Sequence, residues 1–102
     1  MLHLFASLIT QEYFAEFVGT AFLVYVILAT GHHLANGAAL AIAIFLTAGI
    51  CKQSFNPAVS VALVHYGKLP AASLVPYIIA ETLGALFAVL VLSEVCKPGK
   101  WL

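Results

Sequence analysis

The segment KQSFNPAVSVALVHYGKL, residues 52–69, decides the fold of this chain. Asn56 is a residue that favours the N-cap of a helix, and Pro57 suits the first helical position, where its missing N–H costs no hydrogen bond. Gly67 suits the C-cap because glycine adopts left-handed backbone without a steric penalty. The pattern therefore predicts a helix over residues 57–66, about ten residues and about 15 Å long.

This predicted helix is about half as long as the hydrocarbon core of a membrane is thick. One interpretation is a surface loop followed by a helix lying on the membrane, but such a helix should have a charged face, and PAVSVALV has none. A half-length helix flanked by full spans is instead typical of a re-entrant segment. Its non-helical leader is tolerated only where protein or a water-filled cavity satisfies the backbone.

The leader of this segment, residues 52–55, has the features of a path for a small solute. It would expose backbone carbonyl oxygens, and we expect Gln53 and Ser54 to line the pore together with Asn56. The N-terminus of the helix would bring unpaired N–H groups and the positive end of the helix dipole to mid-membrane. A water molecule or hydroxyl group can exchange hydrogen bonds along the carbonyls, whereas the dipole repels protons and other cations.

The composition of the chain places it in a lipid bilayer. Of its 102 residues, 64% are hydrophobic and 8% are charged, and a soluble fold of this length cannot hide so much apolar surface. Apolar runs predict transmembrane helices over about residues 11–31, 36–51 and 71–95. We therefore expect an all-α, multi-pass integral membrane protein, with three transmembrane helices and one re-entrant half-helix in a single unit over residues 1–102.

Small residues recur at spacing four in two of these predicted spans. The second span has Ala39, Ala43 and Thr47, and the third has Ala80, Gly84 and Ala88. Such stripes allow the backbones of two transmembrane helices to approach closely.

Three stretches in this order resemble the N-terminal repeat of the aquaporin and glycerol-facilitator family. They are AEFVGTAFLV in the first span, AIFLTAG followed by NPAVSVAL, and YIIAETLGA in the third span. The order and spacing agree over about residues 11–95. The sequence AIAIFLTAGI and its spacing to Asn56 look closer to the glycerol-conducting branch than to strict water channels.

The resemblance implies two repeats that are inverted in the membrane and whose half-helices meet at paired Asn-Pro-Ala signatures. This chain carries one such signature and looks like a half-length repeat. The resemblance further implies that the Asn56 amide donates to the passing solute, that Pro57 and Ala58 pack the junction between half-helices, and that Glu16 accepts backbone hydrogen bonds from a pore loop. A carboxylate within a span needs such donors, or else stays protonated.

Four positions depart from the pattern of this family. Residues 51–54 are CKQS, where the family usually has Ser-Gly-Gly-His or Ser-Gly-Ala-His. Glu81 replaces the usual glutamine of the third span, and we expect this structural buried acid to be protonated or paired. Asn36 stands where an aromatic residue is common at the constriction, so we expect a smaller, more polar pore wall there. Val59 stands where the second signature is followed by arginine.

The leading interpretation is a channel subunit for passive transport of water or a small polyol such as glycerol. The sequence has no Ser/His/Asp or Cys/His set at plausible positions, so we expect no enzyme activity and no cofactor. The adjacent His32 and His33 have no evident third ligand, so we expect no metal site. Nucleic acid is an unexpected partner because no basic run is present.

Two other interpretations are compatible with the sequence. In the first, the chain is a non-conducting remnant or a modulatory subunit of a full-length channel. In the second, Glu16 and Glu81 relay protons or cations within the membrane. The family resemblance favours a structural role for Glu16.

The expected assembly is a homo-oligomer in which two antiparallel copies complete one another's pore, or a complex with a partner that carries the second repeat. Orientation in a membrane follows the lysines and arginines near the spans. This chain has Lys52 and Lys68 toward one end of the predicted bundle and Lys97 and Lys100 toward the other. This balance gives no preference for either orientation, as a dual-topology protein requires.

Overall fold

The computed structural model describes residues 2–95, with the side chains of residue 7 and residues 9–95. The elements are α1 (Leu2–Thr30), α2 (His33–Thr47), α3 (Pro57–Tyr66), the 3₁₀ turn η1 (Ala71–Ser73) and α4 (Leu74–Val95). The described residues contain no strand, so this part of the protein is all-α as predicted. Lys97 and Lys100 lie outside the described residues.

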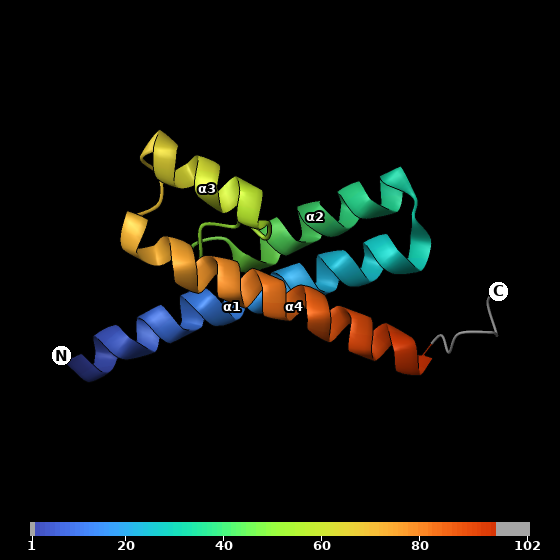
Figure 1. Ribbon diagram of the computed structural model, residues 1–102, viewed down its shortest axis with the longest axis horizontal. Coiled ribbons are helices and arrows are strands. Elements are labelled where there is room, and N and C mark those ends of the chain that lie inside the picture. The colour runs from blue at the N-terminus through green and yellow to red at the C-terminus, as the bar shows by residue number, and fades with distance from the viewer. Residues whose placement is uncertain (1, 96–102) are drawn as a thin grey trace.

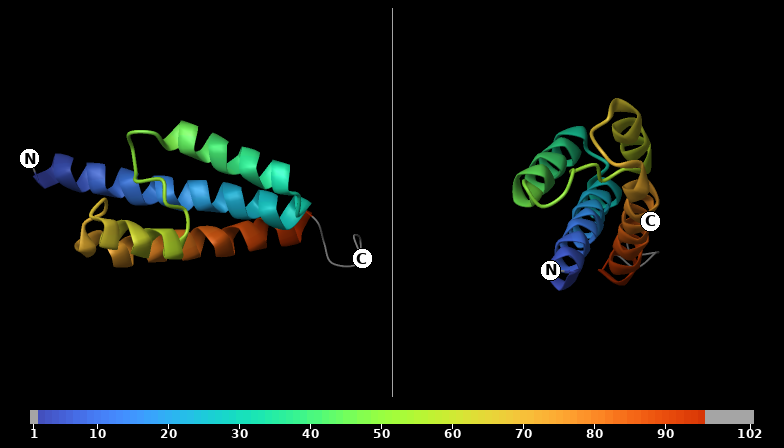
Figure 2. Two further views of the ribbon diagram at one scale, coloured as in Figure 1. Left: turned by 90° about the horizontal axis from the view of Figure 1, so that it is seen from above. Right: turned by 90° about the vertical axis from the view of Figure 1, so that its left-hand side faces the viewer.

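The helix α1 is the central element of the bundle. It contacts α2 and α4, and α3 packs against α4. α1 begins at one end of the long axis and α4 ends at the other, while α3 starts near the middle and runs back toward the start of α4 (Figure 1). Residues 48–56 cross over α1 to connect α2 with α3 (Figure 2). The crossing segment therefore lies over α1, and α3 lies along the first half of α4.

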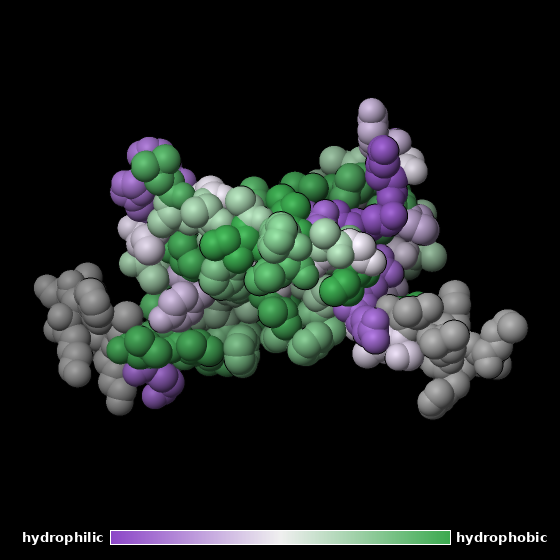
Figure 3. Space-filling model, turned by 180° about the vertical axis from the view of Figure 1, so that it is seen from behind, coloured by the Kyte–Doolittle hydropathy of each residue, from purple (hydrophilic) through white to green (hydrophobic). Residues whose placement is uncertain are grey.

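The exterior of the bundle is largely apolar. Two stretches of the described residues, Ile9–Thr30 and Ala71–Val95, are long and apolar enough to cross a membrane. Large hydrophobic side chains are exposed on every helix, among them Phe14, Phe45, Tyr66 and Leu90. Figure 3 shows apolar colours over the middle of one face and polar colours gathered toward its ends. This distribution suits a protein whose middle is surrounded by lipid.

The helix α2 differs in its bounds from the span expected at residues 36–51. It begins at His33, because the His32 ring accepts a hydrogen bond of 3.2 Å from the Leu34 N–H and caps the helix. It ends at Thr47, shortly before Gly49 takes a left-handed conformation with φ of 80°. Its 15 residues extend about 22 Å at about 1.5 Å per residue. A membrane crossing by α2 stays a prediction.

Small residues bring α1 and α4 into close contact. The stripe of Ala80, Gly84 and Ala88 is buried on α4. A Cβ atom added at Gly84 would lie 2.5 Å from the Phe17 carbonyl oxygen of α1. Because backbone cannot move aside as a flexible side chain can, the helix crossing requires glycine at this position.

Replacing Gly84 by valine should force α1 and α4 apart. We expect Gly84→Val to lower the free energy of unfolding of the bundle. An overpacked core typically loses about 1–3 kcal/mol, and the loss here should be at least that large. Unfolding in detergent followed by circular dichroism measures the loss. Gly37→Val is the matched control, because no heavy atom lies within 4 Å of a Cβ at Gly37. Equal losses in the two variants would contradict the assigned helix contact.

Candidate functional site

The crossing segment of residues 48–56 holds two residues in an unusual backbone conformation. Gln53 and Phe55 have φ values of 59° and 57°, in the left-handed region that residues with a Cβ rarely adopt. The surrounding structure must stabilise this geometry. One support is the Phe55 side chain, which is 2% exposed and packs directly against Gly19. A Cβ atom added at Gly19 would lie 2.2 Å from a carbon of the Phe55 ring. Glycine at position 19 thus makes room for the anchor of the loop on α1.

A buried carboxylate on α1 fixes the backbone of the same loop. Glu16 is fully buried, and its two oxygens accept the N–H groups of Ser54 at 3.1 Å and Phe55 at 2.9 Å. A charged acceptor makes a stronger hydrogen bond than a neutral one, and each buried N–H left without a partner would cost about 1–3 kcal/mol. Glu16 therefore replaces the water that this loop would lack inside a membrane.

Two buried serines connect the loop to α4. The Ser54 hydroxyl donates to the Asn56 carbonyl at 2.9 Å and lies 2.6 Å from the Ser60 hydroxyl oxygen. The Ser60 oxygen in turn lies 2.9 and 3.1 Å from the two carboxyl oxygens of Glu81. Glu81 is also close enough to Glu16 for the two carboxyls to interact electrostatically. The loop, α3 and both long helices thus meet in one buried polar cluster.

The beginning of the loop is attached separately. The Lys52 N–H donates to the Tyr77 hydroxyl at 3.0 Å, and that hydroxyl donates to the Glu12 carboxylate. The Gln53 side-chain amide donates to the Ile44 carbonyl of α2 at 2.5 Å. These bonds tie the loop to all three long elements, so its path across α1 is fixed at both ends.

The N-terminus of α3 is exposed beside this cluster. The Asn56 side-chain oxygen accepts the Ala58 N–H at 2.8 Å and caps the helix, and Asn56, Pro57 and Ala58 are all exposed. Among the described residues, the amide NH₂ of Asn56 has no hydrogen-bond acceptor. The cap therefore turns a free donor outward at the point where the helix dipole is positive.

The structure brings together most of the residues that the sequence singles out. Gln53, Ser54 and Asn56 lie in the segment that crosses α1, and Glu16 on α1 accepts the Ser54 N–H. Asn36 lies apart, on the first turn of α2, where its side-chain oxygen accepts from the Thr30 hydroxyl at 3.4 Å. The side-chain groups of Gln53 and Ser54 make hydrogen bonds within the protein. Of the residues expected to line the pore, Asn56, Pro57 and Ala58 are the exposed ones.

Sequence reasoning missed four residues of this site. They are Glu12, Gly19, Ser60 and Tyr77. Ser60 had a usable signal, because it is the one serine in an otherwise apolar stretch of α3 and lies one turn after Asn56. The packing role of Gly19 had no comparable signal, because its partner Phe55 is remote in the sequence.

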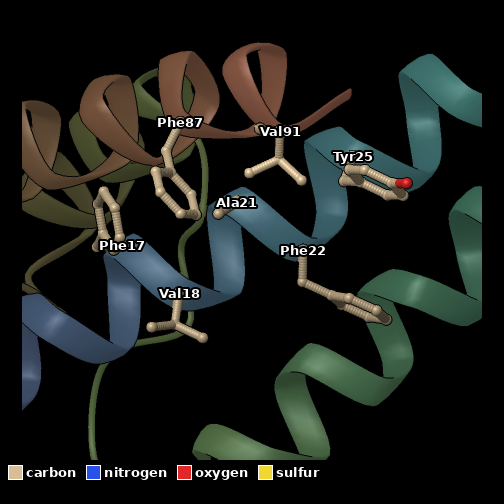
Figure 4. A pocket seen from close by; sticks show the side chains of 8 residues that line it. Phe17, Val18, Ala21, Phe22, Tyr25, Phe87 and Val91 are labelled. Carbon is tan, nitrogen blue, oxygen red and sulfur yellow. The ribbon is translucent and has the colours of Figure 1, made fainter. Parts of the chain in front are cut away.

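The surface also has an apolar groove, which does not suit a polar solute. Figure 4 shows a groove between α1 and α4, of about 270 Å³, lined by Phe17, Val18, Ala21, Phe22, Tyr25, Phe87, Ala88 and Val91. The Tyr25 hydroxyl is the one polar side-chain group in this lining. The candidate site is therefore the exposed tip of α3 and the buried cluster behind it.

Comparison with known proteins assigns the family. A sequence model of the family described as Major intrinsic protein matches residues 4–100. The chain belongs to this family. Major intrinsic proteins are integral membrane proteins, in agreement with the apolar exterior of the bundle.

Several curated relatives of this major intrinsic protein are about twice its length. The chain is 40% identical to glycerol uptake facilitator protein-like 6 of Lactiplantibacillus plantarum, over 76% of this chain and 40% of that protein. It is 39% identical to aquaporin Z of Brucella melitensis, over 84% of this chain and 44% of that protein. It is 32% identical to aquaporin AqpM of Methanothermobacter thermautotrophicus, over 78% of this chain and 45% of that protein. The chain thus spans less than half the length of these relatives.

No solved structure gives a significant match to this chain.

Removing the carboxylate of Glu16 should release the loop of this major intrinsic protein. We expect Glu16→Ala to leave the Ser54 and Phe55 N–H groups unpaired and to destabilise the loop by about 2–6 kcal/mol, at about 1–3 kcal/mol for each buried donor. Hydrogen exchange of these two amides should accelerate. Glu16→Gln keeps one acceptor oxygen and should have an intermediate effect. The exposed acid Glu94 provides the control Glu94→Gln, for which exchange should be unchanged. Unaltered exchange in Glu16→Ala would exclude Glu16 as the anchor.

Proposed function

We propose that this chain is a subunit of a channel that passes water or small neutral solutes such as glycerol, without catalysing a reaction. The observation that carries the proposal is the free amide NH₂ of Asn56 at the exposed N-terminus of α3. Names of relatives, glycerol uptake facilitator and aquaporin, support the same class of solute.

The donor at Asn56 suits a neutral solute for an electrostatic reason. A water molecule or a hydroxyl group accepts a hydrogen bond from the amide, and the positive end of the α3 dipole orients the oxygen of the solute toward the helix. The same dipole opposes a proton or metal cation at this point. The buried cluster of Glu16 and the serines holds the donor in place, because Ser54 bonds directly to the Asn56 carbonyl.

In this proposal α1, α2 and α4 cross the membrane and α3 enters it from one side. α3 has 10 residues and begins near the middle of the long axis of the molecule (Figure 1). Its length of about 15 Å is half of the hydrocarbon thickness of about 30 Å. The tip with Asn56 would therefore lie near the centre of the bilayer.

The pore is completed by a second half, which we propose is an antiparallel copy of the same chain. The exposed side chains of Pro57 and Ala58 present an apolar contact surface for a second tip. Since α1 begins and α4 ends at opposite ends of the bundle, a copy in the reverse orientation brings its own α3 to mid-membrane from the other side. A separate partner with the second repeat is the competing assembly.

Replacing Asn56 by aspartate should reduce flux while preserving the fold. Aspartate caps a helix as well as asparagine does, but it offers no donor to the solute and adds a negative charge. We expect Asn56→Asp to lower the permeability about 5- to 13-fold, as the loss of one hydrogen bond of about 1–1.5 kcal/mol implies. Stopped-flow swelling of vesicles with water and with glycerol measures this loss.

The control for this substitution is Asn56→Ser, which keeps both a cap and a hydroxyl donor and should retain more flux than Asn56→Asp. Circular dichroism verifies that each variant is folded. Wild-type vesicles that swell no faster than empty ones would instead identify the isolated chain as non-conducting.

The antiparallel pair predicts two orientations of the chain in one membrane. Lys52 and Lys68 line the same surface hollow at one end of the bundle, and Lys97 and Lys100 follow α4 at the other end of the sequence. With equal lysine numbers, we expect a C-terminal tag to be accessible from both sides of the membrane. Adding two lysines after Thr30, at the α1–α2 turn, should bias the tag to one side. A wild-type tag found on one side alone, in cells that make no related channel, excludes the antiparallel pair.

A further inference from the structure

We infer that Glu81 carries a proton when the loop is in place, and that this proton positions the tip of α3 through Ser60 and Ser54. The carboxyl group is then a hydrogen-bond donor within the buried cluster and reaches the tip through the serines. The consequence for flux rests on the proposed function, whereas the protonation of Glu81 does not.

The inference follows from counting hydrogen atoms along one line of oxygens. Ser54 Oγ lies 2.9 Å from the Asn56 carbonyl and 2.6 Å from Ser60 Oγ, and Ser60 Oγ lies 2.9 Å from Glu81 Oε2. Each of these three contacts between oxygens needs one hydrogen atom. A serine hydroxyl has one hydrogen and a carbonyl has none, so the two serines supply two. The third must come from the Glu81 carboxyl.

With that proton present, every contact has a donor and an acceptor. Glu81 donates to Ser60, Ser60 donates to Ser54, and Ser54 donates to the Asn56 carbonyl. If Glu81 were ionised, Ser60 would have to donate to it. One of the two remaining contacts would then bring two oxygens together without a hydrogen between them, and such contacts are repulsive.

The charges around Glu81 favour the same assignment. Glu81 is 1% exposed and lies next to the Glu16 carboxyl, which already holds the two backbone N–H donors of the loop. No Lys, Arg or His side chain is buried among the described residues, and Lys52 and Lys68 are exposed. A second negative charge would therefore have no counter-ion in this cluster. Two neighbouring carboxyls in such a site do not both ionise readily.

The other titratable groups near this cluster cannot supply a positive charge. They are Glu12 and Glu16 on α1, Cys51 in the loop, and Tyr77 on α4 itself. On α3, His65 and Tyr66 are exposed at the far end of the helix. Each group near the cluster is an acid, so raising the pH adds only negative charge and strengthens the repulsion of an ionised Glu81.

Loss of the proton should therefore disturb the tip of α3. Ser60 would turn toward the ionised Glu81, Ser54 would lose either its bond to Ser60 or its bond to the Asn56 carbonyl, and the new charge would repel Glu16. Because Glu16 and Ser54 both hold the loop backbone, the Asn56 cap and its free amide would no longer be fixed. The site is thus expected to work in its protonated form and to fail as the pH rises.

Infrared spectroscopy of the purified wild-type chain tests the proton directly. We expect the carbonyl band of a protonated carboxylic acid in neutral buffer and its loss in alkaline buffer. The band should be absent from Glu81→Gln, whose amide still donates to Ser60, and present in Glu94→Gln, which changes an exposed acid on the same helix. No band in the neutral wild type, or an unchanged band in Glu81→Gln, would overturn the inference.

Flux in vesicles tests the positioning role. Wild-type permeability should fall as the pH rises, with a limiting slope of about tenfold per pH unit, as expected for the loss of one proton. Glu81→Gln should keep its flux across this range, and Glu81→Met, which has no donor, should have low flux at every pH. A wild-type flux independent of pH, or the same pH dependence in Glu81→Gln, contradicts the role. If no variant conducts, the proposed function fails, and the infrared result still decides the protonation.

Discussion

The site depends on one interaction, the acceptance of two loop N–H groups by the buried carboxylate of Glu16. A loop that crosses a helix within a membrane has no water to satisfy its backbone, so its donors need partners from the protein. The left-handed conformations of Gln53 and Phe55 turn the N–H groups of Ser54 and Phe55 toward α1. Without the carboxylate, neither the loop geometry nor the start of α3 would be stable.

Close packing by glycine makes this interaction possible. Gly19 admits the Phe55 ring against α1, and Gly84 lets α4 approach the backbone of α1. Hydrogen bonds between oxygens need separations of about 2.5–3.0 Å, and serine side chains are short, so the hydroxyls and carboxyls of four elements meet only if the backbones are close. The buried polar cluster therefore depends on the small residues. The small residues set the distances between the backbones, and the polar groups fix the loop at those distances.

The distribution of polarity explains how the bundle can fold around the loop and the tip of α3. The strong acceptors and donors of the loop are satisfied internally by Glu16, Ser60 and Tyr77, whereas the outer surface is mostly apolar. Asn56, beside this loop, is both polar and exposed, and among the described residues its amide NH₂ has no acceptor. A free donor surrounded by apolar surface is stable in a membrane only beside water, a solute or another protein group. The exposed tip of α3 thus offers a polar group that needs such a neighbour.

The sequence by itself determined the local features of the protein. Composition placed it in lipid, Asn56, Pro57 and Gly67 specified where the short helix begins and ends, and small residues at spacing four marked the faces for close packing. These features depend on neighbours within one or two helical turns. Tertiary structure alone decided that Phe55 fills the space at Gly19 and that Ser60 joins Ser54 to Glu81. Those contacts depend on the path of the loop across α1, which no local pattern encodes, because the partners are brought together only when three helices pack.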